Sequence, residues 1–299
     1  MKQERLKSNL MLLIAAAIWG LAFVAQRVGA KYLGAFSFNG IRFALGSISL
    51  IPLILYNQRV RRSEEERQSS GVTTLIAGGI AGGVLFLAAS LQQIGLAETS
   101  AGKAAFITGL YIVLVPIFGV LLKHKIRMNI WVGAAVAVIG LYILSVTEDF
   151  SISRGDFFEL IGAVLWAVHI LLIDHFTQKV DALKLSVLQF ATCSSLSLIV
   201  AGAFEKITVD ALTQAMIPIL YGGFFSVGIA YTLQVVGQRY AKPSHAAIVL
   251  SMETVFASIG GLLILNENLG VRGYVGCVLM LIGMLLSQLQ FTKREQIQA

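Results

Sequence analysis

Long apolar runs separated by short charged segments constrain this chain more than any other feature. A transmembrane helix needs about 20 mostly apolar residues to cross a hydrocarbon core about 30 Å thick. Runs of about this length lie near residues 8–30, 34–56, 73–94, 101–122, 129–147, 157–177, 184–203, 214–237, 245–265 and 271–290. We therefore expect an all-α integral membrane protein with ten transmembrane helices, and the lipid bilayer is its first expected partner.

The composition excludes the main soluble classes. Only 13% of the 299 residues are charged and 57% are hydrophobic, whereas a soluble domain carries about 25% charged residues. The two cysteines, Cys193 and Cys277, lie in apolar runs, which excludes a disulfide-rich secreted scaffold. The net charge of +7 does not indicate nucleic-acid binding, because the basic residues form short clusters between the runs rather than one basic face.

The distribution of basic residues predicts the orientation in the membrane, because cytoplasmic loops carry an excess of Lys and Arg. Alternate loops collect 16 Lys and Arg on the side of both termini and five on the other side. Arg27 and Arg42 lie inside runs and are not counted. Both termini are therefore expected in the cytoplasm, in a multi-pass protein of the cell (inner) membrane.

The two halves of the sequence correspond to each other. At a shift of 147 residues Trp19 falls on Trp166, Arg42 on Gln189 and Phe43 on Phe190; at 142, Gln92 falls on Gln234 and Gly95 on Gly237; at 143, Gly133 falls on Gly276 and Gly140 on Gly283. We expect two repeats, residues 1–147 and 148–299, each with five spans. Because five is odd, the repeats run in opposite senses, an arrangement typical of secondary transporters with a substrate site between the repeats.

Two ionisable residues inside the runs are the clearest candidates for a substrate site. A charged side chain at membrane depth costs about 2.5–3.5 kcal/mol on insertion scales, and it usually faces the bundle interior or a cavity. Arg42 and Glu253 each lie about eight residues from an end of their run, hence about 12 Å deep at about 1.5 Å per residue. Two interpretations stay open: a buried ion pair that holds helices together, or binding of substrate or a proton.

Further candidates supply aromatic or polar groups at the same depth. Trp19 and Trp166 occupy equivalent positions in the middle of their runs, too deep for interfacial anchors. Other groups that either line a cavity or bond between helices are Gln26, Gln92, Gln93, Tyr111, His169, Tyr231 and Gln234. In the fourth run, Pro116 is expected to kink the helix near its middle.

Neither a metal site nor a catalytic site is expected. His169, Asp174 and His175 form the most suggestive metal-binding cluster. At about 100° per residue, Asp174 and His175 lie roughly 140° and 240° round the helix from His169, so the three cannot converge on one ion. No nucleophile and base are placed to converge either. We expect no cofactor, no metal and no enzymatic activity.

Several sequence segments, in this order, carry a family resemblance. They are IWG at Ile18–Gly20, NGIRFALGS around Arg42, TSAGKAAFITGLYIVLVPIFGVLL, LLIDHF, LQF at Leu188–Phe190, and HAAIVLSMETVFASIGGLLILNEN. Through them the chain resembles the EamA-type members of the drug/metabolite transporter superfamily over nearly its whole length. The resemblance implies ten helices, a central cavity between the halves, and movement of small organic metabolites, often outward.

The resulting functional hypothesis is a secondary transporter. It moves a small polar metabolite, an amino acid or a related compound, in the export direction by alternating access. Arg42 would attract an anionic group of the substrate, and Glu253 a cationic group or a coupling proton. Two alternatives stay open: a carrier of phosphorylated or nucleotide-linked sugars, which would need more than one buried cation, and a non-transporting scaffold or sensor using the loop 57–71.

Overall fold

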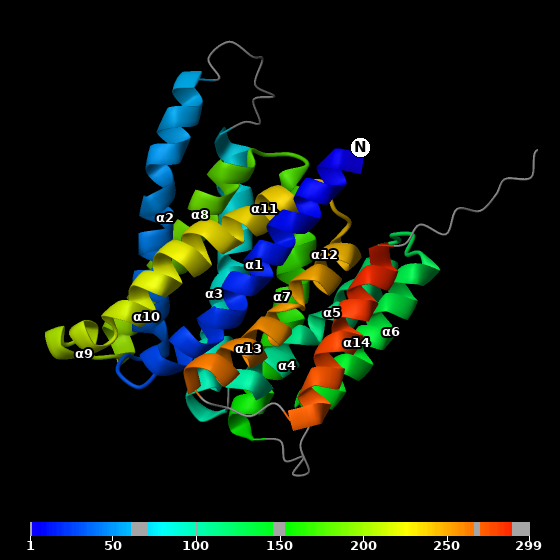
Figure 1. The fold of residues 1–299 in the computed structure, drawn as a ribbon. Coiled ribbons are helices and arrows are strands. Elements are labelled where there is room, and N and C mark those ends of the chain that lie inside the picture. The colour runs from blue at the N-terminus through cyan, green and yellow to red at the C-terminus, as the bar shows by residue number, and fades with distance from the viewer. Residues whose placement is uncertain (1, 61–70, 100, 146–152, 266–269, 289–299) are drawn as a thin grey trace, which may run out of the picture.

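The computed structural model describes residues 2–60, 71–99, 101–145, 153–265 and 270–288, and the regular structure within these ranges is entirely helical. Figure 1 shows the start of the first helix and the end of the last one toward the same end of the bundle. We call this the N-terminal end and the other the opposite end. Residues 61–70, most of the loop considered above as a contact surface, lie outside the described ranges.

The first half of the chain contains six helices. They are α1 (Lys2–Gly29), α2 (Ala35–Val60), α3 (Gly71–Glu98), α4 (Ala101–Gly109), α5 (Tyr111–Leu121) and α6 (Met128–Ser145). Helix α1 begins six residues before the apolar run 8–30, and α2 ends four residues after the run 34–56. Both extensions consist mostly of polar residues. The two helices therefore continue beyond the length that the hydrocarbon core requires.

The second half contains eight α-helices and one π-helical segment. They are α7 (Arg154–Thr177), α8 (Ala182–Phe204), α9 (Val209–Gln214), α10 (Met216–Leu220), the π-helix η1 (Tyr221–Tyr231), α11 (Thr232–Gln238), α12 (Pro243–Leu250), α13 (Glu253–Leu265) and α14 (Gly270–Gln288). Helices α10 to α11 form one continuous apolar segment, Met216–Gln238.

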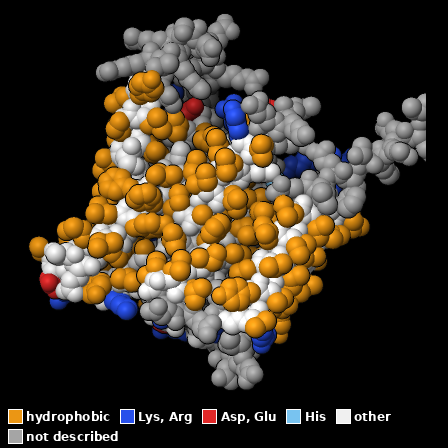
Figure 2. All heavy atoms as spheres, in the orientation of Figure 1, with side chains coloured by type: hydrophobic (Ala, Val, Ile, Leu, Met, Phe, Trp, Pro, Cys, Tyr) orange, Lys and Arg blue, Asp and Glu red, His pale blue; other side chains and the backbone are white. Residues whose placement is uncertain are grey.

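Nine segments of the described chain are long and apolar enough to cross a membrane. A further apolar helix, Met128–Ile143, lies where the fifth run was predicted but is shorter than the others. Figure 2 shows hydrophobic side chains covering the middle of the visible face, with Lys and Arg toward its two edges. This is the surface expected of a protein that is surrounded by lipid.

The helices pack in matching pairs across the two halves. Helix α1 packs against η1, α11, α12 and α13, and α7 packs against α3, α4 and α5. Helices α2 and α8 pack together, as do α6 and α14. In the last pair the backbones touch, since a Cβ on Gly133 or Gly140 would lie 2.7 Å from the carbonyl oxygen of Gly283 or Gly276.

Two membrane segments are interrupted at equivalent places. Helix α4 ends before Leu110, whose N–H donates to the carbonyl oxygen of Ile107, three residues earlier, at 3.1 Å. Met252 lies 142 residues after Leu110, and its N–H likewise donates to the carbonyl oxygen three residues earlier, at 3.2 Å. Pro116 lies inside α5, six residues after Leu110, so the interruption of this segment does not fall at the proline. Each interruption places a polar side chain, Tyr111 or Glu253, at the start of the next helix.

Candidate functional site

A pocket lies between the two halves of the chain, at the level of the two interruptions. Its 14 lining residues come from α1, α2, α3, α4, α5, α7, η1, α11, α12 and α13. The cavity measures about 40 Å³, which holds a few water molecules at about 10–15 Å³ each, so a metabolite can bind only when the surrounding helices move apart.

Ten of the 14 lining residues form five pairs related by the repeat shifts. At a shift of 147 the pairs are Trp19 with Trp166 and Phe23 with Ile170. At a shift of 142 they are Gln92 with Gln234, Thr108 with Leu250, and Tyr111 with Glu253. The two halves therefore contribute equivalent positions to one pocket.

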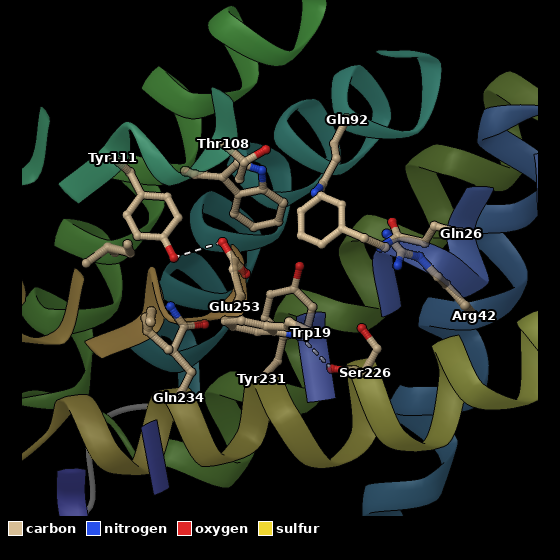
Figure 3. Close-up of a pocket in the computed structure, with 14 residues that line it drawn as sticks. Trp19, Gln26, Arg42, Gln92, Thr108, Tyr111, Ser226, Tyr231, Gln234 and Glu253 are labelled. Atoms are coloured by element: carbon tan, nitrogen blue, oxygen red, sulfur yellow. Dashed lines mark hydrogen bonds between the residues drawn. The ribbon is translucent and has the colours of Figure 1, made fainter. Parts of the chain in front are cut away.

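One side of the pocket carries a buried carboxylate. Tyr111 Oη donates a hydrogen bond to Glu253 Oε1 at 2.9 Å, and both side chains are buried (Figure 3). Helix α1 approaches this point closely at Gly20, the glycine of the IWG motif. A Cβ there would lie 2.6 Å from the carbonyl oxygen of Glu253, so a larger residue would push α1 away from the pocket.

The other side of the pocket carries a buried cation. Arg42 is 1% exposed, and its Nε donates to Asn39 Oδ1 at 3.0 Å. The guanidinium carbon lies 5.0 Å from the ring centroid of Phe43 and 5.5 Å from that of Phe38, within cation–π range. Among the described residues no carboxylate pairs with Arg42, so the direct ion pair considered above, with Glu253, is not formed.

Aromatic rings form the wall between the two charged residues. The ring centroids of Trp19 and Tyr231 lie 4.6 Å apart, and those of Trp166 and Tyr231 lie 6.1 Å apart. Trp19 Nε1 donates to the carbonyl oxygen of Ser226 at 3.1 Å (Figure 3). That carbonyl belongs to the π-helix, a rare geometry that is frequent at functional sites.

Three buried polar atoms of lining residues have no hydrogen-bond partner within the described chain. They are Trp166 Nε1, Gln26 Oε1 and Gln234 Oε1. Buried polar groups are paired in the great majority of cases, so unpaired ones around a pocket are places where a ligand or water bonds. Besides its two charged groups, the site therefore has one N–H donor and two carbonyl acceptors that a ligand or a water molecule could satisfy.

Eight of the nine predicted site residues line this pocket. The exception is His169, which lies behind the wall with no exposed surface. Its Nε2 donates to Gln189 Oε1 at 2.9 Å, and its ring packs edge-on against Trp166 with centroids 5.9 Å apart. His169 therefore packs behind Trp166 and is not one of the lining residues.

Sequence reasoning did not include five residues that line the pocket. They are Phe23, Thr108, Ile170, Ser226 and Leu250. Four of these form repeat-related pairs, so extending the shifts of 147 and 142 by one helical turn would have found them. Ser226 carries no such signal, because the residue related to it by the shifts does not line the pocket.

Comparison with known proteins identifies the family. The model of the EamA-like transporter family matches residues 6–146 and again residues 153–289. The chain belongs to this family. An uncharacterized transporter of Archaeoglobus fulgidus is 29% identical over 288 residues, which span 96% of this chain and 87% of that protein. The uncharacterized transporter YoaV of Bacillus subtilis is 23% identical, over 97% of this chain and 99% of that protein.

A solved structure shares the fold. One crystal structure matches with a TM-score of 0.75 and 17% sequence identity, over 94% of this chain and 96% of that one. At this identity the match concerns the fold alone. Together with the family match and the apolar helices, it describes a multi-pass membrane transporter of the EamA type.

Proposed function

We propose that this EamA-family transporter is a secondary carrier that moves an amino acid, or a closely related small polar metabolite, out of the cell. The observation that carries the proposal is one pocket holding Arg42 and Glu253 without a bond between them. An isolated buried charge is costly, and a ligand that carries both an anionic and a cationic group compensates both charges at once. Trp19, Trp166 and Tyr231 contact the remainder of such a ligand.

The same arrangement disfavours a phosphorylated or nucleotide-linked sugar. A phosphate carries up to two negative charges, and sites that bind it use several Lys or Arg donors. Arg42 is the one cation among the lining residues of the described pocket. A carboxylate, Glu253, faces the same space and would repel a phosphate.

Alternating access between two inverted repeats completes the proposed mechanism. The repeats are residues 1–147 and 148–299, with ten spans in all and both termini in the cytoplasm. Support comes from the double match to one family model, from the repeat-related pairs in the pocket and from the matching helix contacts. In this mechanism each repeat can adopt the conformation of the other. When the two repeats exchange conformations, the pocket closes to one side of the membrane and opens to the other. The outward direction follows from the family resemblance.

Counterflow into proteoliposomes tests the proposal. Purified protein is reconstituted with an unlabelled pool of amino acids or of sugar phosphates inside. Uptake of the matching labelled pool is then measured, and the two uptakes are compared. We expect label to accumulate from one amino-acid pool. R42Q and E253Q should each reduce it about tenfold or more, because a hydrogen bond to a charged group contributes about 1.5–3 kcal/mol. E253Q should also remove any pH dependence of the rate.

The matched control is E98Q, which neutralises an exposed carboxylate at the end of α3, outside the pocket. It should transport like the unchanged protein. Accumulation of sugar phosphates would contradict the proposed substrate class. Absence of counterflow from every pool, with monodisperse protein, would contradict the proposed transport function. That result would favour the alternative of a non-transporting scaffold or sensor.

A further inference from the structure

A second carboxylate is buried next to the pocket and has no role in the mechanism above. Glu159, on α7, has no exposed surface. Its Oε2 accepts a hydrogen bond from Thr108 Oγ1 at 3.1 Å, and its Oε1 has no partner within the described chain. Thr108 itself lines the pocket. One hydroxyl group therefore separates this carboxylate from the space in which a substrate would bind.

The repeat shows that the fold does not need a carboxylate at this position. A shift of 147 relates Glu159 to Leu12, and a shift of 142 relates Thr108 to Leu250 and Gly95 to Gly237. Glu159 packs on Gly95, where a Cβ would lie 2.7 Å from Oε1, and Leu12 packs on Gly237, where a Cβ would lie 3.2 Å from Cγ. In the second crossing, between α1 and α11, leucines thus occupy the positions that Glu159 and Thr108 occupy beside the crossing of α3 and α7. The carboxylate and the hydroxyl are therefore not required by the shared fold.

Within the described ranges, no cation pairs with Glu159. On its own helix Asp156 lies one turn away, and Lys103 of α4 bonds to Asp156 at 2.7 Å. Helix α3 carries the exposed Glu98 at its end, and the pocket side carries Glu253 and Tyr111. A carboxylate with an unpaired oxygen, other carboxylates nearby and no bound cation is stabilised by taking up a proton.

We propose that Glu159 is a proton-binding site that is filled from the pocket through the hydroxyl of Thr108. In the loading step Thr108 Oγ1 gives its hydrogen to the Glu159 carboxylate, and at the same time it takes a proton from a hydronium ion in the pocket or from protonated Glu253. One O–H bond forms on Glu159 and one is renewed on Thr108, while the hydronium ion becomes water or Glu253 becomes a carboxylate. The use of this proton in transport rests on the proposed carrier function, but its binding does not.

Infrared spectroscopy of the protein in lipid nanodiscs tests the site without any substrate. The carbonyl stretching band of a protonated carboxylic acid is followed in difference spectra while the pH is varied. We expect a band that titrates in the unchanged protein, is lost in E159Q and is retained in E98Q. A titrating band that persists undiminished in E159Q, or spectra in which E159Q and the unchanged protein are identical, would overturn the proposal.

A second variant keeps the test valid if E159Q does not fold. T108L/E159L copies the leucines of the equivalent crossing, Leu12 and Leu250, and should therefore pack well. Loss of the same band supports the site, and its survival in the folded double variant overturns it. T108V should keep the band but slow its response to a pH jump, an effect that a purely structural Glu159 would not show.

The counterflow assay separates this proposal from the carrier function. If the unchanged protein shows no counterflow but has the titrating band, the carrier function fails and the proton site stands. If counterflow is present and the band is not altered by E159Q, the carrier stands and the proton site fails.

Discussion

The two ends of the bundle carry equivalent contacts with different chemistry. At the opposite end, Lys103 Nζ donates to Asp156 Oδ2 at 2.7 Å. The positions related to these by the shifts of 142 and 147 are His245 and Asn9 at the N-terminal end, where His245 Nε2 donates to Asn9 Oδ1 at 2.8 Å. An ion pair on one side is thus replaced by a hydrogen bond between an imidazole and an amide on the other.

The helix crossings beside these contacts differ in the same sense. At the opposite end the backbones of α3 and α7 touch, since a Cβ on Gly155 would lie 2.8 Å from the carbonyl oxygen of Gly95. At the N-terminal end the equivalent residue is Ser8, whose Oγ donates to the carbonyl oxygen of Gly237 at 2.7 Å. Equivalent helices thus pack backbone to backbone at one end and through a side-chain hydrogen bond at the other. We expect the N-terminal end to open more readily.

The largest expected effect comes from exchanging the residues at the two crossings. G155S places a side chain against a backbone oxygen, and overpacking of this kind costs about 1–3 kcal/mol. The matched change S8G removes one buried hydrogen bond, which costs about 0.5–1.5 kcal/mol. The melting temperature of purified protein should fall more for G155S than for S8G. Equal shifts, or a larger one for S8G, would remove the asymmetry between the crossings.

A smaller effect is expected from breaking the ion pair at the opposite end. K103M keeps the length of the side chain but leaves Asp156 with hydrogen bonds from Thr99 and Ser153. Because the Lys103 side chain is 31% exposed, the loss should be about 1 kcal/mol, roughly a fivefold change in the population open at that end.

Alkylation of a single cysteine measures that population. S226C places the thiol in the pocket wall, in a background in which Cys193 and Cys277 are replaced by alanine. An impermeant maleimide added from the side of the opposite end should label the K103M protein about fivefold faster. Unchanged labelling from that side would show that the ion pair does not hold the end closed.

The smallest expected effect comes from installing the ion pair at the N-terminal end. N9D/H245K copies the pair formed by Asp156 and Lys103, and a partly exposed pair contributes about 0.5 kcal/mol. Labelling of the same cysteine from the N-terminal side should slow about twofold, while N9D alone, which adds the acid without the lysine, serves as the control. Faster labelling of the double variant would contradict the proposed role of these contacts in closure.

Much of the site could be predicted because the repeat marks it in the sequence. The pairs Trp19 with Trp166 and Gln92 with Gln234 were found from the shifts alone, and the structure places all four in the pocket wall. His169 was included because it is polar at membrane depth, but depth does not say which way a side chain points. It points toward Gln189, away from the pocket.

Glu159 was overlooked for a related reason. It is the third residue of the predicted run 157–177, where a charged residue usually reaches the membrane surface. The structure buries it completely, because α3 and α4 pack over this end of α7. No property of α7 by itself carries that information.

The sequence by itself determined the membrane class, the approximate spans and the correspondence of the two halves. These follow from the hydrophobicity of single segments and from residues that recur at fixed shifts, which are properties of the chain before it folds. Only the tertiary structure decided that Leu110 and Met252 interrupt their helices, that Tyr111 meets Glu253, and that Arg42 has no carboxylate partner. These features depend on contacts between helices far apart in the chain, whose distances and tilts are set by packing and not by any local pattern.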